Sequence, residues 1–187
     1  MENVEPAGFW IRAAGRMIDW IPNWIAGAIA GGVLAFTWGV LKAMNKPVSD
    51  WPDTAGNRKI LLWIAGVIAS WLYHSFSEAV AGATLGKRLL GLEVVSETLA
   101  PANLVQTLKR DLAYFVDAFF FGAVAYSHMK DSPEKQRIGD EWGKTRVVLR
   151  RSLPPESRRP TALFVCAFLA AVGLAAQTML IAYMLLI

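Results

Sequence analysis

Three long apolar segments constrain the fold of this chain more than any other feature. They run over Ile21–Met44, Ile60–Val80 and Thr161–Ile187, and none contains a lysine or arginine before its last few residues. A helix rises about 1.5 Å per residue, so each segment is long enough to cross the hydrocarbon core of a bilayer. Hydrophobic residues make up 55% of the chain, more than a soluble domain of 187 residues hides in one core. The sequence therefore predicts an all-α multi-pass membrane protein with three transmembrane helices.

A fourth apolar stretch, Leu112–Met129, either spans the bilayer or enters and returns as a re-entrant or interfacial helical hairpin. A span would place 6 of the 19 Lys and Arg residues on one side and 13 on the other, with the N-terminus outside. A hairpin would divide them 15 to 4, with the N-terminus inside. Because Lys and Arg collect on the cytoplasmic side, the larger bias favours the hairpin, and four spans are the alternative. We expect a cell inner-membrane protein with a cytoplasmic N-terminus.

Two short runs outside the apolar segments have the composition of β-strands, Leu92–Val95 and Arg146–Leu149. Strands that pair must lie on the same side of the membrane, which requires an even number of crossings between them. A re-entrant hairpin over Leu112–Met129 satisfies this condition, whereas a single span does not. The two runs therefore predict a short cytoplasmic β-hairpin beside three spans and a re-entrant element.

Charged residues at the start of the first apolar segment are candidates for a functional site, because unpaired charges are costly in a membrane. Arg12, Arg16 and Asp19 have helical spacings of four and three, so either arginine can approach the carboxylate. Pro22 cannot donate a hydrogen bond to the carbonyl of Ile18, and a carboxylate beside a free carbonyl could hold a small cation or a proton. The alternative is that Pro22 is the first residue of the span and the charges lie among lipid headgroups.

Ionisable residues also occur in the other apolar stretches. His74 and Glu78 lie one turn apart in the second segment, and a histidine in contact with a carboxylate can pass a proton near neutral pH. Asp117 is a third candidate, in the stretch predicted to re-enter. We hypothesise that these three residues and Asp19 face one polar cavity that holds an ion or a proton. The alternative is that His74 and Glu78 only cap the helix bundle or meet water.

Several sequence motifs resemble those of one membrane protein family. They are Gly8–Arg12 followed by Arg16–Asp19, Thr84–Val95 with its Gly-Lys-Arg triplet, and Ile138–Asp140 followed by Thr145–Val148. Their order and spacing over residues 7–149 resemble the RDD family, which takes its name from one arginine and two aspartates. The resemblance implies a membrane protein of a family that has been suspected of transport, without a settled ligand.

The resemblance assigns family positions to individual residues. The family's arginine falls on Arg12, its first aspartate on Asp19 and its second on Asp140. Arg110 matches a further common arginine.

The resemblance also divides the chain into three parts. They are an RDD-like membrane domain over 1–149, a Pro/Arg-rich linker over 150–160 and an additional C-terminal transmembrane helix over 161–187. Two features depart from the family: the turn at Ser96–Pro101 lacks the usual glycine, and the last helix is extra.

Asp140 differs from the other carboxylates because it lies outside the apolar segments among several cations. We expect it to form a structural ion pair with Arg12 or Arg88, which would tie the cytoplasmic hairpin to the foot of the first helix. Removing one partner of such a desolvated pair is strongly destabilising.

The composition argues against an enzyme. The chain has two histidines, no glycine-rich phosphate loop, no Cys/His cluster with metal-ligand spacing and no nucleophile elbow. We therefore expect no catalytic residue, no metal and no cofactor. The basic run Lys144–Arg159 is explained by anionic lipid and a cytoplasmic location, so we expect no nucleic-acid partner.

Small residues four apart, such as Gly27 and Gly31 or Ala171 and Ala175, predict faces where helices pack closely. Three or four spans leave one chain little room for a private aqueous path, so we expect a homo-oligomer or a complex with another membrane protein. The sequence predicts a transport-associated membrane protein that handles a small cation or a proton. The alternative is a non-catalytic accessory or scaffold subunit of a larger membrane complex.

Overall fold

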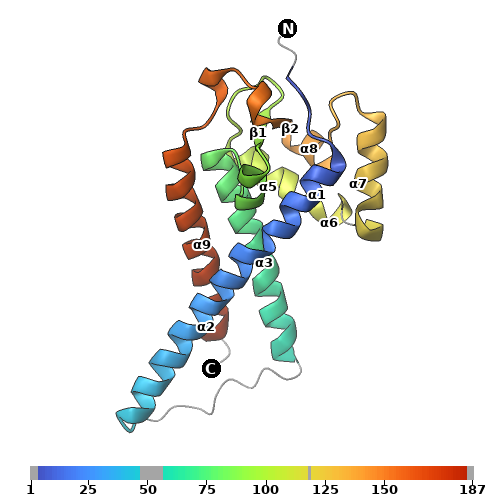
Figure 1. Ribbon diagram of the computed structural model, residues 1–187. Coiled ribbons are helices and arrows are strands. Elements are labelled where there is room, and N and C mark those ends of the chain that lie inside the picture. The colour runs from blue at the N-terminus through green and yellow to red at the C-terminus, as the bar shows by residue number, and fades with distance from the viewer. Residues whose placement is uncertain (1–3, 47–56, 118, 185–187) are drawn as a thin grey trace. The chain divides into compact units, whose positions relative to one another are not determined.

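The computed structural model describes residues 4–46, 57–117 and 119–184, which are mostly helical (Figure 1). The helices are α1 (Phe9–Ile18), α2 (Trp20–Ala43), α3 (Asn57–Ala81), α4 (Leu85–Leu89), α5 (Leu104–Leu112), α6 (Tyr114–Asp117), α7 (Phe119–Asp131), α8 (Ile138–Gly143) and α9 (Thr161–Met184). The strands are β1 (Leu92–Ser96) and β2 (Thr145–Leu149), and two short 3-10 helices are η1 (Arg150–Ser152) and η2 (Pro155–Ser157).

The chain forms two compact units. Unit 1 comprises the chain up to Trp20 together with His74–Ala171, and unit 2 comprises Ile21–Tyr73 with the chain from Val172. Unit 1 therefore holds α1, the strands, α4 to α8 and the ends of α3 and α9 that adjoin them in sequence. The charged residues singled out in the sequence all belong to unit 1.

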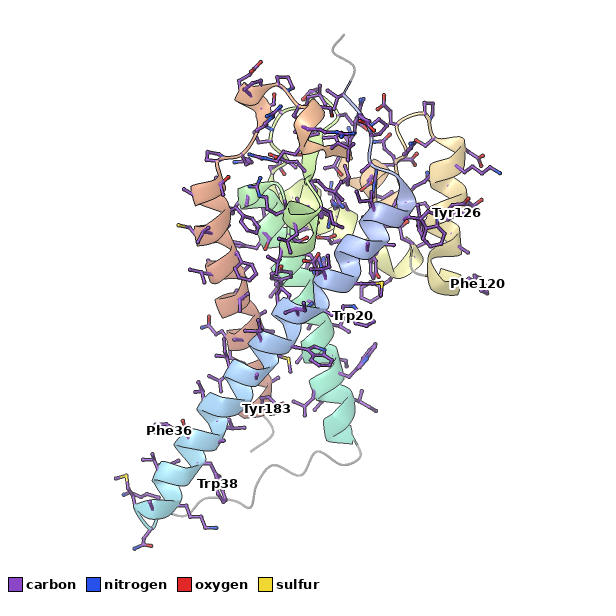
Figure 2. The ribbon with its side chains drawn as sticks, viewed as in Figure 1. Trp20, Phe36, Trp38, Phe120, Tyr126 and Tyr183 are labelled. Carbon is purple, nitrogen blue, oxygen red and sulfur yellow. The ribbon has the colours of Figure 1, made fainter. Side chains whose placement is uncertain are left out.

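Three helical segments are long and apolar enough to cross a membrane: Phe9–Ala43, Ile60–Ala81 and Pro155–Met184. They contain the three apolar segments of the sequence, so the prediction of three transmembrane helices is confirmed. Many large apolar side chains of α2 are exposed, among them Trp24 and Phe36, and Figure 2 labels Phe36 on this helix. Phe36 is 74% exposed, which suits a helix whose solvent is lipid.

Residues 104–131 contain a bend instead of one straight helix. The helical stretches Leu104–Asp117 and Gly122–Asp131 meet at 112°. At about 1.5 Å per residue, neither stretch alone crosses the hydrocarbon core. This geometry fits the re-entrant or interfacial helical hairpin that the sequence predicts.

β1 and β2 pair antiparallel, with Val94 opposite Val147, as the sequence predicts. Helices α5 to α8 fill the connection between the strands, so no tight turn joins them. Figure 1 shows the strands beside α5 and α8, and residues of both helices contact β2. The chain before α1 adds to β2, because the N–H of Ala7 donates to the Val147 carbonyl at 2.9 Å.

All five residues of β1 are buried. Because successive side chains of a strand point to opposite faces, both faces of this small sheet are covered. Leu92, Val94 and Val147 pack with Ala7 and Ala102 in one cluster. A second cluster contains Val95, Val148 and Leu153. The sheet thereby fixes both the segment that leads into α1 and the segment that follows β2.

The turn after β1 explains the departure from the family pattern. Leu99 has a φ of 62°, in the left-handed region that favours glycine. The turn closes through a hydrogen bond from the N–H of Ser96 to the carbonyl of Ala100 at 2.8 Å. A leucine therefore occupies the conformation for which glycine is the usual residue.

Glycines allow two close backbone approaches within unit 1. A Cβ atom at Gly139 or Gly143 of α8 would lie 2.4 Å or 2.6 Å from a carbonyl oxygen of α5. A Cβ atom at Gly86 of α4 would lie 2.0 Å from the carbonyl oxygen of Gly15 in α1. Because these positions lack side chains, α8 can contact the backbone of α5 and α4 can contact that of α1.

We expect Gly86→Ala to destabilise the protein by about 1–3 kcal/mol or more, because the added methyl group forces α4 away from α1. Gly8→Ala is the matched control, since nothing lies within 4 Å of a Cβ atom there and its φ is −72°. Thermal unfolding in detergent should give a lower midpoint for Gly86→Ala and a nearly unchanged one for Gly8→Ala. Equal midpoints for the two variants would contradict the close approach of the backbones.

Candidate functional site

Unit 1 buries many charged side chains. The following residues expose at most 7% of their surface: Arg12, Asp19, His74, Glu78, Lys87, Glu93, Arg110, Asp111, Asp117 and Asp140. Burying a charge costs several kcal/mol unless partners compensate it, so the value of this cluster depends on how its members are paired.

Asp19 lies between α1 and α2 and is fully buried. Its carboxylate accepts hydrogen bonds from the hydroxyl of Thr84 at 2.6 Å and from the N–H of Gly86 at 2.8 Å. His74 Nε2 lies 3.6 Å from Asp19 Oδ2. Protein groups therefore enclose the Asp19 carboxylate. Pro22 lies in the first turn of α2, where the missing N–H costs little.

Glu78 lies one helical turn after His74 in α3 and binds two cations. Lys87 Nζ of α4 lies 2.7 Å from Glu78 Oε1, and Arg110 Nε of α5 lies 3.2 Å from Glu78 Oε2. Glu78 is thus paired inside the protein. The alternative interpretation, in which Glu78 meets water, does not fit this pairing. It connects the α3 end of the cluster to α5.

Arg12 and Asp140 form the shortest ion pair that joins α1 to α8, with 2.6 Å between Arg12 Nη1 and Asp140 Oδ2. The guanidinium group also donates to the carbonyl oxygens of Ala7 at 3.0 Å and Lys135 at 2.8 Å. These donors hold Arg12 in one orientation. Arg12 is one of the two partners that the sequence analysis named for Asp140.

Two further arginines surround Asp140. Arg110 Nη1 and Arg137 Nη2 lie 3.5 Å and 3.6 Å from Asp140 Oδ1, and the N–H of Arg137 donates to Oδ2 at 3.1 Å. Burial alone would raise the pKa of the Asp140 carboxyl. The guanidinium groups of Arg110, Arg137 and Arg12 outweigh burial and hold this pKa well below its usual range.

Asp117 lies at the end of α6, next to α8. Arg137 Nε is 3.8 Å from Asp117 Oδ2, and the N–H of Gly139 donates to the same oxygen at 3.3 Å. Asp111 of α5 accepts a hydrogen bond from the hydroxyl of Ser75 at 3.1 Å. These carboxylates extend the cluster along α5 and α6.

The contacts form two groups in unit 1, which together we call the buried ion chain. One group is Asp19 with His74. The other begins at Glu78, one turn after His74 on α3, and continues through Lys87, Arg110 with Asp111, Asp140 with Arg12, Arg137 and Asp117. The four candidate ion or proton residues of the sequence all belong to it. Asp117 borders a cavity of about 490 Å³, and the other three candidates lie outside the lining of that cavity.

Arg88 does not pair with Asp140, so that alternative is wrong. The chain turns after α4 into β1, and this turn brings Arg88 Nη1 to 3.9 Å from Glu93 Oε2. Glu93 also binds the Arg150 guanidinium and accepts a hydrogen bond from the N–H of Arg159 at 2.7 Å. Residues 150 and 159 of the predicted linker are therefore attached to β1.

Sequence reasoning missed several members of the buried ion chain. Lys87 belongs to the Gly-Lys-Arg triplet, but nothing in that triplet identifies Glu78 as its partner. Arg137 is one of the several cations near Asp140 in the sequence, but the pattern does not identify its partners. A usable signal is the spacing of Gly139 and Gly143, which marks the face of α8 that contacts α5.

Replacing Asp140 with asparagine should destabilise the protein by about 3–5 kcal/mol, because three buried guanidinium groups lose their shared carboxylate. Glu141→Gln is the matched control, since the Glu141 side chain is 49% exposed and pairs with His128 at the surface. The measurement is the free energy of unfolding in mixed micelles. A stable Asp140→Asn variant that has lost only transport would contradict the structural role.

The contribution of Asp140 should also depend on pH. Its pKa is depressed in the folded protein, so its stabilisation is complete above the ordinary carboxyl pKa of about 4 and is lost as pH falls toward the folded value. The difference in unfolding free energy between wild type and Asp140→Asn should therefore shrink as pH falls below about 4. A difference that is the same at neutral and at acid pH would rule out this charge effect.

Comparisons with known proteins show the family of this chain. The model of the RDD family matches residues 6–144, which include Arg12, Asp19, Arg110 and Asp140. The protein described as uncharacterized protein YxaI of Bacillus subtilis (strain 168) is 30% identical over 158 residues, covering 78% of this chain and 99% of that protein. No solved structure matches the chain. Since the family model covers more than half of the chain, the chain belongs to the RDD family.

Proposed function

We propose that this chain is a transport-associated integral membrane protein in which Asp19 and His74 take up and release a proton. The observation that carries the proposal is the 3.6 Å distance between His74 Nε2 and Asp19 Oδ2, with both side chains buried. Imidazole and carboxylate groups can each accept and release a proton, so a histidine and an aspartate this close can pass one between them. This pair is therefore the part of the buried ion chain best suited to a proton.

A proton suits these carboxylates better than a bare metal cation does. The oxygens of Asp19 accept hydrogen bonds from Thr84 and Gly86, and those of Glu78 contact Lys87 and Arg110. A small cation would have to displace these donors and would meet positive charge at Glu78. A proton needs no such space, since it can move between His74 and a neighbouring oxygen.

The same proposal includes an orientation. With residues 104–131 as a re-entrant hairpin, 15 of the 19 Lys and Arg residues lie on the side of the N-terminus. That bias supports an N-terminus in the cytoplasm and a location in the cell inner membrane.

The proposal includes no catalytic activity for this chain.

An accessory or scaffold subunit is the second candidate, and one observation favours it. Gly27 and Gly31 lie one turn apart on α2, and a Cβ atom at either position would meet no described residue within 4 Å. Such a small-residue face allows another helix to approach closely. The helix could come from a second copy of this chain or from a different membrane protein.

Proton flux through liposomes tests the first candidate. Purified protein is reconstituted with a pH-sensitive dye inside, and a pH gradient is imposed with and without opposing gradients of Na⁺ or K⁺. We expect wild type to dissipate the gradient faster than empty liposomes and His74→Gln to lose at least about tenfold of this rate, as for loss of a proton-transfer group. His128→Gln is the matched control, because His128 is the other histidine of the chain and its side chain is 35% exposed.

Two outcomes would contradict proton handling by His74. One is wild-type liposomes that behave like empty ones under every gradient. The other is equal flux from His74→Gln and wild type. A foreign membrane protein that co-purifies with wild type in a fixed ratio, together with absent flux, would favour the accessory subunit instead.

A further inference from the structure

The cavity that Asp117 borders has a lining rich in cations. Its volume is about 490 Å³, and residues of α1, α5, α6 and α7 form most of its wall. Five cationic side chains line it, namely Arg12, Arg16, Lys87, Arg110 and Arg137, against two acidic ones, Asp111 and Asp117. This composition favours a negatively charged occupant.

Arg16 differs from the other four cations of the lining. Those four pair with carboxylates of the buried ion chain, through Asp140, Glu78 or Asp117. No carboxylate among the described residues lies within ion-pairing distance of Arg16. Its positive charge is therefore available to a ligand that enters the cavity.

Tyr114 holds the guanidinium group of Arg16 in place. The central carbon of the guanidinium lies 4.1 Å from the centre of the Tyr114 ring. A guanidinium group held over a ring face can still donate through its N–H groups. Two parallel N–H donors fit the oxygens of a phosphate group in a bidentate arrangement.

The remaining lining is apolar and reaches the surface. Phe9, Met17, Trp20 and Met129 contribute to it, and Met17 and Trp20 are 65% and 61% exposed. Figure 2 shows Trp20 where α1 leads into α2, and Tyr126 on α7. The ring of Tyr126 packs edge to face against Phe9, with 5.3 Å between ring centres. An occupant with an apolar part can therefore keep that part beside apolar side chains.

Arg16 lies near one end of the first membrane segment. It precedes Ile21, where the long run without charged residues begins, by five residues. A cation near the end of such a run can extend toward the headgroups, where anionic lipids attract it.

We propose that this cavity binds a phosphate oxyanion through Arg16, and that an anionic phospholipid supplies it. Arg16 donates to the phosphate, Tyr114 keeps the guanidinium oriented, and the apolar lining accommodates the first part of an acyl chain. Arg12, Lys87, Arg110 and Arg137 add positive potential while they stay paired with their carboxylates. The site is separate from the proposed proton site, since neither Asp19 nor His74 lines the cavity.

The test measures ligand binding to purified protein by native mass spectrometry and by thermal stabilisation in detergent. The probes are dioleoylphosphatidylglycerol, dioleoylphosphatidylcholine and inorganic phosphate. We expect phosphatidylglycerol to bind more tightly than phosphatidylcholine, and Arg16→Gln to weaken phosphatidylglycerol binding about tenfold, as for loss of a charged hydrogen-bond donor. Arg151→Gln is the matched control, because the Arg151 side chain is 78% exposed and lies outside the cavity.

The probes separate the two sources of a phosphate group. Arg16-dependent binding of phosphatidylglycerol without any effect of inorganic phosphate supports the lipid headgroup. Arg16-dependent binding of both supports a site that recognises the phosphate group itself. Equal binding of phosphatidylglycerol by wild type and Arg16→Gln, or an equal loss in Arg151→Gln, would overturn the proposal.

A second variant covers the case in which Arg16→Gln fails to fold. Tyr114→Leu keeps the positive charge of Arg16 but removes the ring on which the guanidinium stacks. We expect it to weaken phosphatidylglycerol binding severalfold while its melting temperature without lipid stays measurable. Wild-type affinity in Tyr114→Leu would then overturn the proposal.

Discussion

The ion pair between Arg12 and Asp140 is the interaction on which the rest of unit 1 depends. It joins α1 to α8 across 128 residues of sequence, and both groups are buried. Removing either partner would leave the other charge buried with fewer compensating groups, which is strongly destabilising. Because the remaining donors of Arg12 bind the carbonyls of Ala7 and Val147, the same side chain also holds the N-terminal segment against β2. One guanidinium group thus couples the first helix, the sheet and α8.

The two proposed functions share α1 but use different residues of it. Asp19 takes its hydrogen bonds from α4 and the turn before it and lies beside His74, whereas Arg16 borders the cavity next to Tyr114. These two residues are three positions apart, so a small rotation of α1 would disturb both environments. The ion pair of Arg12 opposes such a rotation, because it fixes the first turns of the same helix. The structural ion pair of Arg12 and Asp140 is therefore a condition both for the proposed proton transfer at Asp19 and for the proposed phosphate binding at Arg16.

The sequence could predict the spans and the strand pairing because each follows from a simple pattern, namely apolar length and β-type runs that must share one side. Arg12 and Asp140 could be named as partners because the family resemblance marks both residues. The position of Arg110 between Glu78 and Asp140 could not be predicted, since it depends on how closely α5 approaches α8. A six-residue helix such as α8 is too short for its periodicity to reveal which neighbour it contacts.

The close helix contacts and the buried charges are two aspects of one constraint. A Cβ atom at Gly139 would lie 2.4 Å from the carbonyl oxygen of Arg110, so any side chain there would move α8 away from α5. Asp140 follows Gly139, so the same movement of α8 would carry the Asp140 carboxylate away from the Arg110 guanidinium, which now lies 3.5 Å from it. Charge attraction weakens with distance, and it weakens further when water enters the gap and raises the dielectric constant. The close approach of α8 to α5 at Gly139 is therefore what lets the Asp140 carboxylate and the Arg110 guanidinium share a buried, dry environment.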